Sequence, residues 1–280
     1  MMILARIYKR LNLLSIDVCL GAVAGGIMAW HVLEVKPPWA YWVILPLSVW
    51  LVYTADHIID GLKPHVSLSH QRHIFHLNNR KKLVIAAIPT GIATAFLAFT
   101  YLPLPVILYG CLLGTAVLLY LFLIMKIPRR APGVLQKELI IALLYVAGIW
   151  GPLVVMRSSP GAYDWLVMTV FLLLALADLL LLSIIEFKAD QEAGQHSFPG
   201  SFGPQRAMAL FKTVSIIALS GAAFIILTGP GSQYHKAAII LGAMDISLIL
   251  ISNLPGSSRY KDLYRYLSEL VFILPAIMLI

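Results

Sequence analysis

The chain has 280 residues, of which 60% are hydrophobic and only 12% are charged, and its mean hydropathy is +0.87. Soluble domains carry about 25% charged residues, so this composition excludes an ordinary soluble protein. Two cysteines, Cys19 and Cys111, cannot build a disulfide framework, and no Cys or His pair has zinc-finger spacing. The net charge of +8 must first be tested for membrane sidedness. We therefore expect an integral membrane protein with no nucleic-acid partner.

Apolar runs long enough to cross a bilayer recur along the whole chain. A helix needs about 20 apolar residues to cross a hydrocarbon core. Pro and Gly clusters such as Lys36-Pro37-Pro38 and Ser159-Pro160-Gly161 separate several of the runs. The sequence predicts nine spanning helices, at residues 14–34, 39–60, 83–101, 103–125, 137–156, 163–186, 208–228, 236–254 and 264–280.

The basic residues predict the orientation of these spans. If the loops alternate between the two sides, 18 of the 21 Lys and Arg residues lie on the side of the N-terminus, and only Lys36, Arg157 and Lys236 lie on the other. Cytoplasmic loops carry an excess of Lys and Arg. We therefore expect a multi-pass protein in the lipid bilayer, with its N-terminus and long loops in the cytoplasm and its C-terminus outside.

The first 13 residues are basic and partly apolar, which is typical of an interfacial segment that leads into the first span. No soluble domain or linker is apparent in the sequence. We expect residues 1–280 to form a single transmembrane domain.

Two pairs of acidic residues end two of the predicted spans. Asp56 and Asp60 close the second span, and Glu186 and Asp190 close the sixth, on the same predicted side. Four-residue spacing places both carboxylates of a pair on one helix face, where they repel unless a cation lies between them. Oxygen ligands of this kind favour Mg²⁺, which binds through one or two carboxylates together with substrate phosphates. The other loop acids, Glu34, Asp164, Glu192 and Asp262, are expected to be solvated.

Basic side chains surround the acidic pairs in the same loops. Such cations donate charge-assisted hydrogen bonds to phosphate oxygens. Acids, metal and cations at the mouth of an apolar bundle indicate a substrate with a diphosphate head and a hydrocarbon tail. The simpler alternative is that these cations only obey the positive-inside rule. The basic candidates for substrate binding include Arg72, Lys137 and Lys188.

With these motifs the sequence resembles the UbiA superfamily of intramembrane prenyltransferases. Asp56 and Asp60 match the two aspartates of the family's Asn-x-x-x-Asp-x-x-x-Asp motif, and Glu186 and Asp190 match its Asp-x-x-x-Asp motif. Lys137 is similar to the Lys that opens the fifth helix in many members. The resemblance implies an all-α bundle around a central cavity, with the four acids as catalytic Mg²⁺ ligands, a prenyl diphosphate substrate and a lipophilic or aromatic acceptor.

The sequence departs from the family pattern at three positions of these motifs. Val52 stands where the first motif has Asn, Glu186 stands for Asp, and Leu182 stands where an Asn precedes the second motif. Fewer polar ligands are compatible with weaker binding of one metal ion, with altered geometry or with a degenerate site.

Several further residues have more than one interpretation. His70, His73 and His76 are compatible with a solvated loop helix, with a role toward the diphosphate or as a general base, or with zinc or iron ligation; of these we take His73, with Arg72, as the substrate-binding candidate. Asp178, like Asp17, Asp245 and Glu269, is either a structural polar contact or a group that orients an acceptor or stabilises a carbocation. Tyr53 and Tyr145 either pack in the bundle or line the pocket, where cation–π contact stabilises an allylic cation.

Prenyl transfer to an acceptor is the leading hypothesis from the sequence. A terpene cyclase would use the same ionisation of the diphosphate but let the carbocation close on itself. A catalytically inactive membrane scaffold would keep only the fold. A transporter is disfavoured, because nine spans do not divide into two equal repeats and the charged residues cluster at one face.

Overall fold

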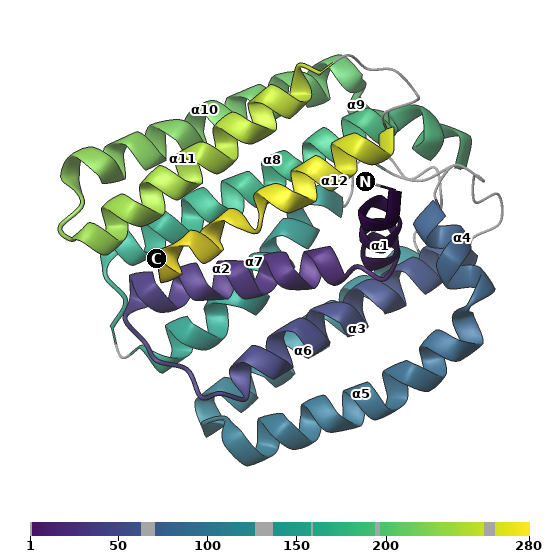
Figure 1. Cartoon of the computed structure of the whole chain (residues 1–280), viewed down its shortest axis with the longest axis horizontal. Coiled ribbons are helices and arrows are strands. Elements are labelled where there is room, and N and C mark those ends of the chain that lie inside the picture. The colour runs from purple at the N-terminus through teal and green to yellow at the C-terminus, as the bar shows by residue number, and fades with distance from the viewer. Residues whose placement is uncertain (1, 63–70, 127–136, 158, 194–196, 255–260) are drawn as a thin grey trace.

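The computed structural model describes residues 2–62, 71–126, 137–157, 159–193, 197–254 and 261–280, and the elements in these ranges are all helices. Long helices run side by side, while the short helices α1, α4 and α9 gather toward one end of the bundle, which we call the α4 end (Figure 1). The predicted all-α fold class is confirmed. The helices are α1 (Met2–Leu13), α2 (Ile16–Leu33), α3 (Tyr41–Leu62), α4 (Gln71–Asn78), α5 (Arg80–Tyr101), α6 (Leu104–Lys126), α7 (Lys137–Met156), α8 (Ala162–Ala193), α9 (Phe198–Phe202), α10 (Pro204–Thr228), α11 (Ser232–Ser252) and α12 (Lys261–Val271), followed by the 3₁₀ helix η2 (Leu274–Leu279).

Eight of these helices, in the described part of the chain, are long and apolar enough to cross a membrane. They are α2, α3, α5, α6, α7, α8, α10 and α11, and they correspond to the first eight predicted spans. The ninth prediction, residues 264–280, corresponds to α12 and η2 with a break between them. Pro275 lies at the start of η2, and because proline has no backbone N–H it cannot continue the α-helical hydrogen-bond ladder. The count of nine spanning helices is therefore not confirmed.

Helices α5 and α6 carry most of their side chains on the outside of the bundle. Ile85, Ile88, Ile92, Phe96 and Phe99 recur every three or four residues along α5, and all five are exposed. In water such a stripe would be unstable, but lipid tails are as apolar as these side chains. The exposed stripe therefore fits a helix that faces lipid.

The centre of the bundle lies where α2 meets α7 and α8. Gly25 of α2 allows this approach, because a Cβ added there would lie 2.9 Å from the Phe171 ring and 3.3 Å from Ile149. Trp150, Phe171 and Ile149 are fully buried around it. Small residues let membrane helices approach closely, which is how the bundle gains packing energy where the hydrophobic effect is weak.

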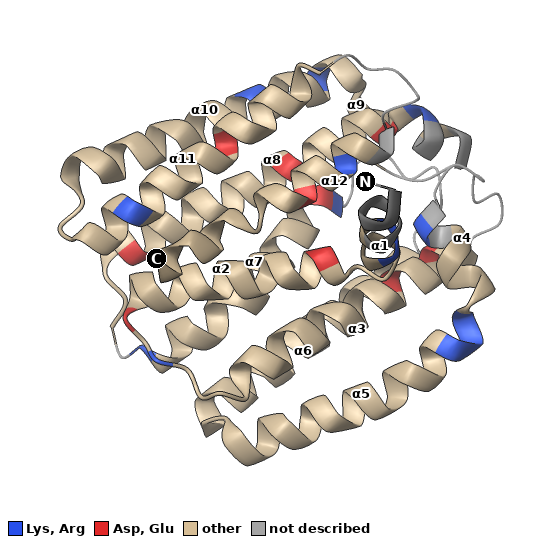
Figure 2. Cartoon of the chain, viewed as in Figure 1, with Lys and Arg blue, Asp and Glu red and all other residues tan. Residues whose placement is uncertain are grey.

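Charged residues are concentrated near the α4 end, while long stretches of the helices carry none (Figure 2). A smaller polar group lies at the opposite end. There the Tyr234 hydroxyl donates to Asp164 Oδ1 at 2.9 Å, and Arg157 Nη2 lies 3.4 Å from Asp164 Oδ2. Asp164 is only 2% exposed, so the expectation that it is solvated was wrong. Arg157 lies seven residues before Asp164, whereas Tyr234 is 70 residues away in the sequence, so the local sequence carries no sign of the tyrosine partner.

The contact between α6 and α7 gives a test of this packing. The Tyr109 hydroxyl donates to the Ala147 carbonyl at 2.9 Å, and a Cβ on Gly151 would overlap the Tyr109 ring. We expect Gly151→Ala to lower the free energy of unfolding by about 1–3 kcal/mol, because the ring must move out of its place. Thermal unfolding in detergent measures this. The control is Gly110→Ala on α6, where an added Cβ meets nothing within 4 Å; equal melting temperatures for the two variants would contradict the α6–α7 contact.

Candidate active site

One cavity of about 300 Å³ opens among helices α2, α3, α6, α7, α8 and α12. Its polar lining includes Asp56 and Asp60 near the end of α3, Lys137 at the start of α7 and Glu186 late in α8. Deeper along α3 the lining changes to Val49 and Val52, of which Val49 lies about 10 Å from Asp56 at 1.5 Å per residue. The cavity therefore combines a charged mouth at the α4 end with a mostly apolar interior, whose lining also includes Asp178.

The first acidic pair lies on one face of α3, as its spacing predicts. Asp60 is almost fully buried, and its Oδ2 atom accepts a hydrogen bond from Lys137 Nζ at 3.2 Å. Lys137 keeps 28% of its side chain exposed, so its ammonium group remains accessible from the cavity. One turn earlier, Asp56 lies beside His57, with 4.0 Å between Asp56 Oδ2 and His57 Nδ1.

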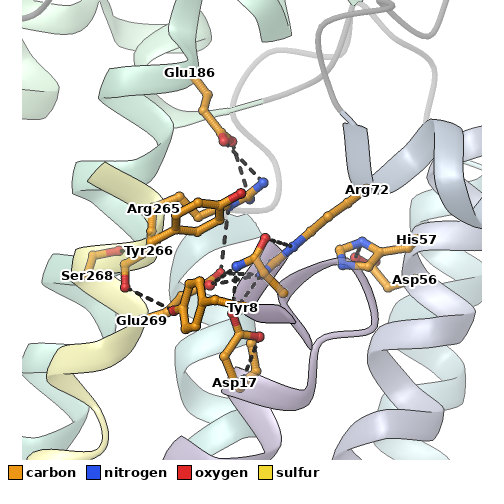
Figure 3. A network of polar contacts seen from close by, with 12 residues as sticks. Tyr8, Asp17, Asp56, His57, Arg72, Glu186, Arg265, Tyr266, Ser268 and Glu269 are labelled. Carbon is orange, nitrogen blue, oxygen red and sulfur yellow. Dashed lines mark hydrogen bonds and ion pairs between the residues drawn. The ribbon is translucent and has the colours of Figure 1, made fainter. Parts of the chain in front are cut away.

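The second acidic pair contributes Glu186 to the same cavity. Arg265 of α12 holds this carboxylate, with Nη1 3.2 Å from Oε1 and Nη2 3.5 Å from Oε2 (Figure 3). The side chain of Asp190, the other member of the pair, lies outside the described residues. The structure thus brings three of the four predicted acids, Asp56, Asp60 and Glu186, to one cavity.

Arg72 reaches the wall of the cavity from α4, but its guanidinium is bound to other protein groups. Nη2 lies 2.8 Å from Glu269 Oε1 and 3.3 Å from Asp17 Oδ2, and Nε donates to Asn12 Oδ1 at 3.2 Å. Asn12 in turn donates to Asp17 and Glu269, at 2.5 Å each. We call Asn12, Asp17, Arg72 and Glu269 the Arg72 cluster (Figure 3). It ties α1, α2, α4 and α12 together, and Arg72 is also among the residues that line the cavity, so its predicted role in substrate binding stays a prediction.

The other predicted site residues differ in their placement. Tyr53, Tyr145 and Asp178 line the cavity. Lys188 is exposed and is not among the described residues of its lining. His73 lies on α4, but its side chain is outside the described residues.

The histidine run is not a solvated stripe as far as it is described. His76 is fully buried, and its Nδ1 atom lies 2.9 Å from the Arg72 carbonyl oxygen. The centroid of its ring lies 4.9 Å from the centroid of the His57 ring. Burial lowers the pKa of His76. His70 lies outside the described residues, so the metal-binding alternative for this run stays a prediction.

Two cavity residues were not recognised as site residues from the sequence. Arg265 was counted only among the basic residues of one side, although its four-residue spacing from Glu269 is a signal of an ion pair on one helix. Nothing in the sequence marks Glu138 as a site residue. Its Oε1 atom accepts hydrogen bonds from the Ser183 hydroxyl at 2.8 Å and from the Phe198 amide at 2.7 Å, which joins α7, α8 and α9.

Comparison with solved structures identifies the fold. A UbiA homolog from Archaeoglobus fulgidus, in a structure bound to DMAPP and Mg²⁺, superposes with a TM-score of 0.64 over 96% of this chain and 98% of that chain, at 15% identity. The chain has the UbiA-superfamily fold. A structure of a UbiA homolog from the same organism bound to GPP and Mg²⁺ gives a TM-score of 0.61 at 16% identity, over 96% of this chain and 99% of that chain. No protein-family profile and no curated protein matches the sequence. At this identity the likeness shows the UbiA fold, not the activity.

The Arg72 cluster gives a prediction about stability. Arg72→Gln should lower the free energy of unfolding by about 3–5 kcal/mol, because it leaves Asp17 and Glu269 buried without their cation. Chemical or thermal unfolding in detergent measures the change. The control is Arg80→Gln, which alters an exposed arginine on the next helix. The triple variant Arg72→Gln, Asp17→Asn, Glu269→Gln should recover most of the loss, and no recovery would contradict the assigned pairing.

Proposed function

We propose that this chain is an Mg²⁺-dependent intramembrane prenyltransferase, which ionises an allylic prenyl diphosphate and transfers the prenyl group to a lipophilic acceptor. One observation carries the proposal: acidic residues from the ends of α3 and α8 face a single cavity whose interior is mostly apolar. A diphosphate head and a hydrocarbon tail need these two environments side by side. The UbiA fold and the prenyl diphosphates bound by the Archaeoglobus fulgidus homolog support the same substrate class.

The side chains present fit a magnesium ion that the substrate helps to bind. Within the described ranges, no group of three or more His, Cys, Asp or Glu side chains is placed to hold a metal by itself. Mg²⁺ does not need one, because it commonly binds through one or two carboxylates together with substrate phosphates. Asp56, Asp60 and Glu186 would supply those carboxylates, with Asp190 as the fourth proposed ligand. The ion would neutralise the charge that develops on the departing diphosphate.

Protein groups around the acids would hold the diphosphate. Lys137 Nζ already points at the first acidic pair and can donate to a phosphate oxygen next to Asp60. The Tyr120 hydroxyl is buried at the cavity wall and has no hydrogen-bond partner among the described residues. A buried donor without an acceptor is costly, so this hydroxyl supports a polar ligand at the mouth of the cavity.

The deeper walls would hold the prenyl group and exclude water from the carbocation. Val52, Leu113 and Val117 are among the apolar residues there. Tyr53 and Tyr145 also line the cavity, and their ring faces can stabilise a cation. Asp178 on α8 is the candidate to orient an acceptor. We further propose that the α4 end lies in the cytoplasm, because most of the Lys and Arg residues lie on that side.

Diphosphate release tests the proposed function directly. The purified protein should release diphosphate from at least one allylic prenyl diphosphate in the presence of Mg²⁺, and an aromatic acceptor should become prenylated. Release without an acceptor, accompanied by a cyclic hydrocarbon, would instead identify a terpene cyclase. No release with any chain length would favour an inactive scaffold.

The second acidic pair gives a sharper prediction. Glu186→Gln should abolish turnover, because a neutral amide cannot offset the charge of the metal, whereas Glu186→Asp should retain part of it. Steady-state diphosphate release measures both variants. Glu34→Gln, an exposed acid at the opposite end of the bundle, is the matched control and should behave like the parent. If Glu186→Gln ionises the substrate as fast as the parent, the second acidic pair has no role in catalysis.

Val52, which stands in place of Asn in the first motif, gives another prediction. Val52 lines the cavity one turn before Asp56, where an amide oxygen would reach the proposed metal. Val52→Asn should therefore raise the affinity for Mg²⁺ several-fold, as measured by competition with Mn²⁺. Val43→Asn, an exposed position on the same helix, is the control. Unchanged affinity would mean that the metal does not bind near Val52.

A further inference from the structure

Two basic side chains of the cavity, Lys137 and Arg265, are paired with its acids in the same way. Lys137 is bonded to Asp60 of the first acidic pair, and Arg265 is bonded to Glu186 of the second. Each cation comes from a helix other than that of its acid, α7 in one case and α12 in the other. Both keep about a quarter of their side chain exposed, 28% for Lys137 and 23% for Arg265.

Arg72 differs from these two cations, although it also lines the cavity. Only 5% of its side chain is exposed, and its partners Asp17 and Glu269 belong to neither acidic pair. Arg265 also lies 3.7 Å from Glu269, through its Nε atom, while its two terminal nitrogens face Glu186. Glu269 therefore lies close to both arginines, and the Arg72 cluster adjoins the Nε side of the Arg265 guanidinium (Figure 3).

We propose that Arg265 is a diphosphate-binding residue, which contacts the phosphate oxygens beside the second acidic pair as Lys137 does beside the first. The proposal rests on the proposed function. If Glu186 also holds the metal ion, Arg265 would share the Glu186 carboxylate with it. Its terminal nitrogens could then turn to the phosphate oxygens, because a planar guanidinium can donate two parallel hydrogen bonds to phosphate. Arg265 thus neutralises Glu186 before the ligand arrives and part of the diphosphate charge afterwards.

Two binding measurements, made without turnover, separate this role from a structural one. Mn²⁺ binding to the protein alone probes the carboxylates, and binding of a non-hydrolysable thio-analogue of a prenyl diphosphate with Mg²⁺ probes the full site. Arg265→Gln should weaken binding of the analogue about tenfold or more, since a charge-assisted contact is lost. The same variant should bind Mn²⁺ as tightly as the parent or more tightly, because Glu186 loses a competing cation. Arg265→Lys should lose less affinity for the analogue, because it keeps the charge.

The control is Arg157→Gln, which changes an arginine of similar exposure, 24%, that is paired with Asp164 at the opposite end of the bundle. It should leave both affinities unchanged. Weaker binding of both Mn²⁺ and the analogue in Arg265→Gln would show that Arg265 only supports the fold of the site, and unchanged analogue binding would show that it does not contact the diphosphate. Either result overturns the proposal. If the parent itself fails to bind the analogue, the proposed function fails, and the role of Arg265 fails with it.

Discussion

Pairing of buried charges is the constraint on which the α4 end of this bundle depends. An isolated charge is expensive to bury, and within a membrane few waters are available to solvate it. The Arg72 guanidinium is paired with two carboxylates, those of Asp17 and Glu269, which lie 55 and 197 residues away in the sequence. The short helix α4 has only eight residues and would be marginal alone. The helix packs along α3, and the Arg72 side chain links it to α2 and α12.

The same constraint shapes the candidate active site. Without a partner, the Asp60 and Glu186 carboxylates would carry unbalanced negative charge. Each lies 3.2 Å from a basic side chain. These pairs balance the charge of both acids without a ligand, and under the proposed function a metal ion and a diphosphate would take over part of this pairing. Lys137 and Arg265 would then donate to the diphosphate, whose negative charge would lie beside the carboxylates. Under the proposed function, the charge pairs that stabilise the cavity would therefore also take part in ligand binding.

The fold tolerates wide change in sequence because its main requirements are simple. Long apolar helices with small residues at their contacts, such as Gly25 and Gly151, suffice for the bundle. This agrees with a TM-score of 0.64 at only 15% identity. The motif positions are less permissive in principle, and here Val52 and Leu182 stand where the resemblance led us to expect amides. Both line the cavity, so these substitutions change the site itself and not a distant surface.

The sequence by itself determined the features that depend on local composition. Hydropathy over about 20 residues predicted nine spanning helices, of which eight correspond to long apolar helices in the described residues, and four-residue spacing placed Asp56 and Asp60 on one face of α3. It missed the break before η2, where one proline divides an apolar run. The tertiary structure alone decided the partners: that Arg72 is bound by Asp17 and Glu269, that Arg265 reaches Glu186, and that Asp164 is buried against Tyr234. The physical reason is that helix formation and membrane insertion depend on residues near in sequence. The pairing of buried charges depends on which helices meet in space, and single segments do not encode it.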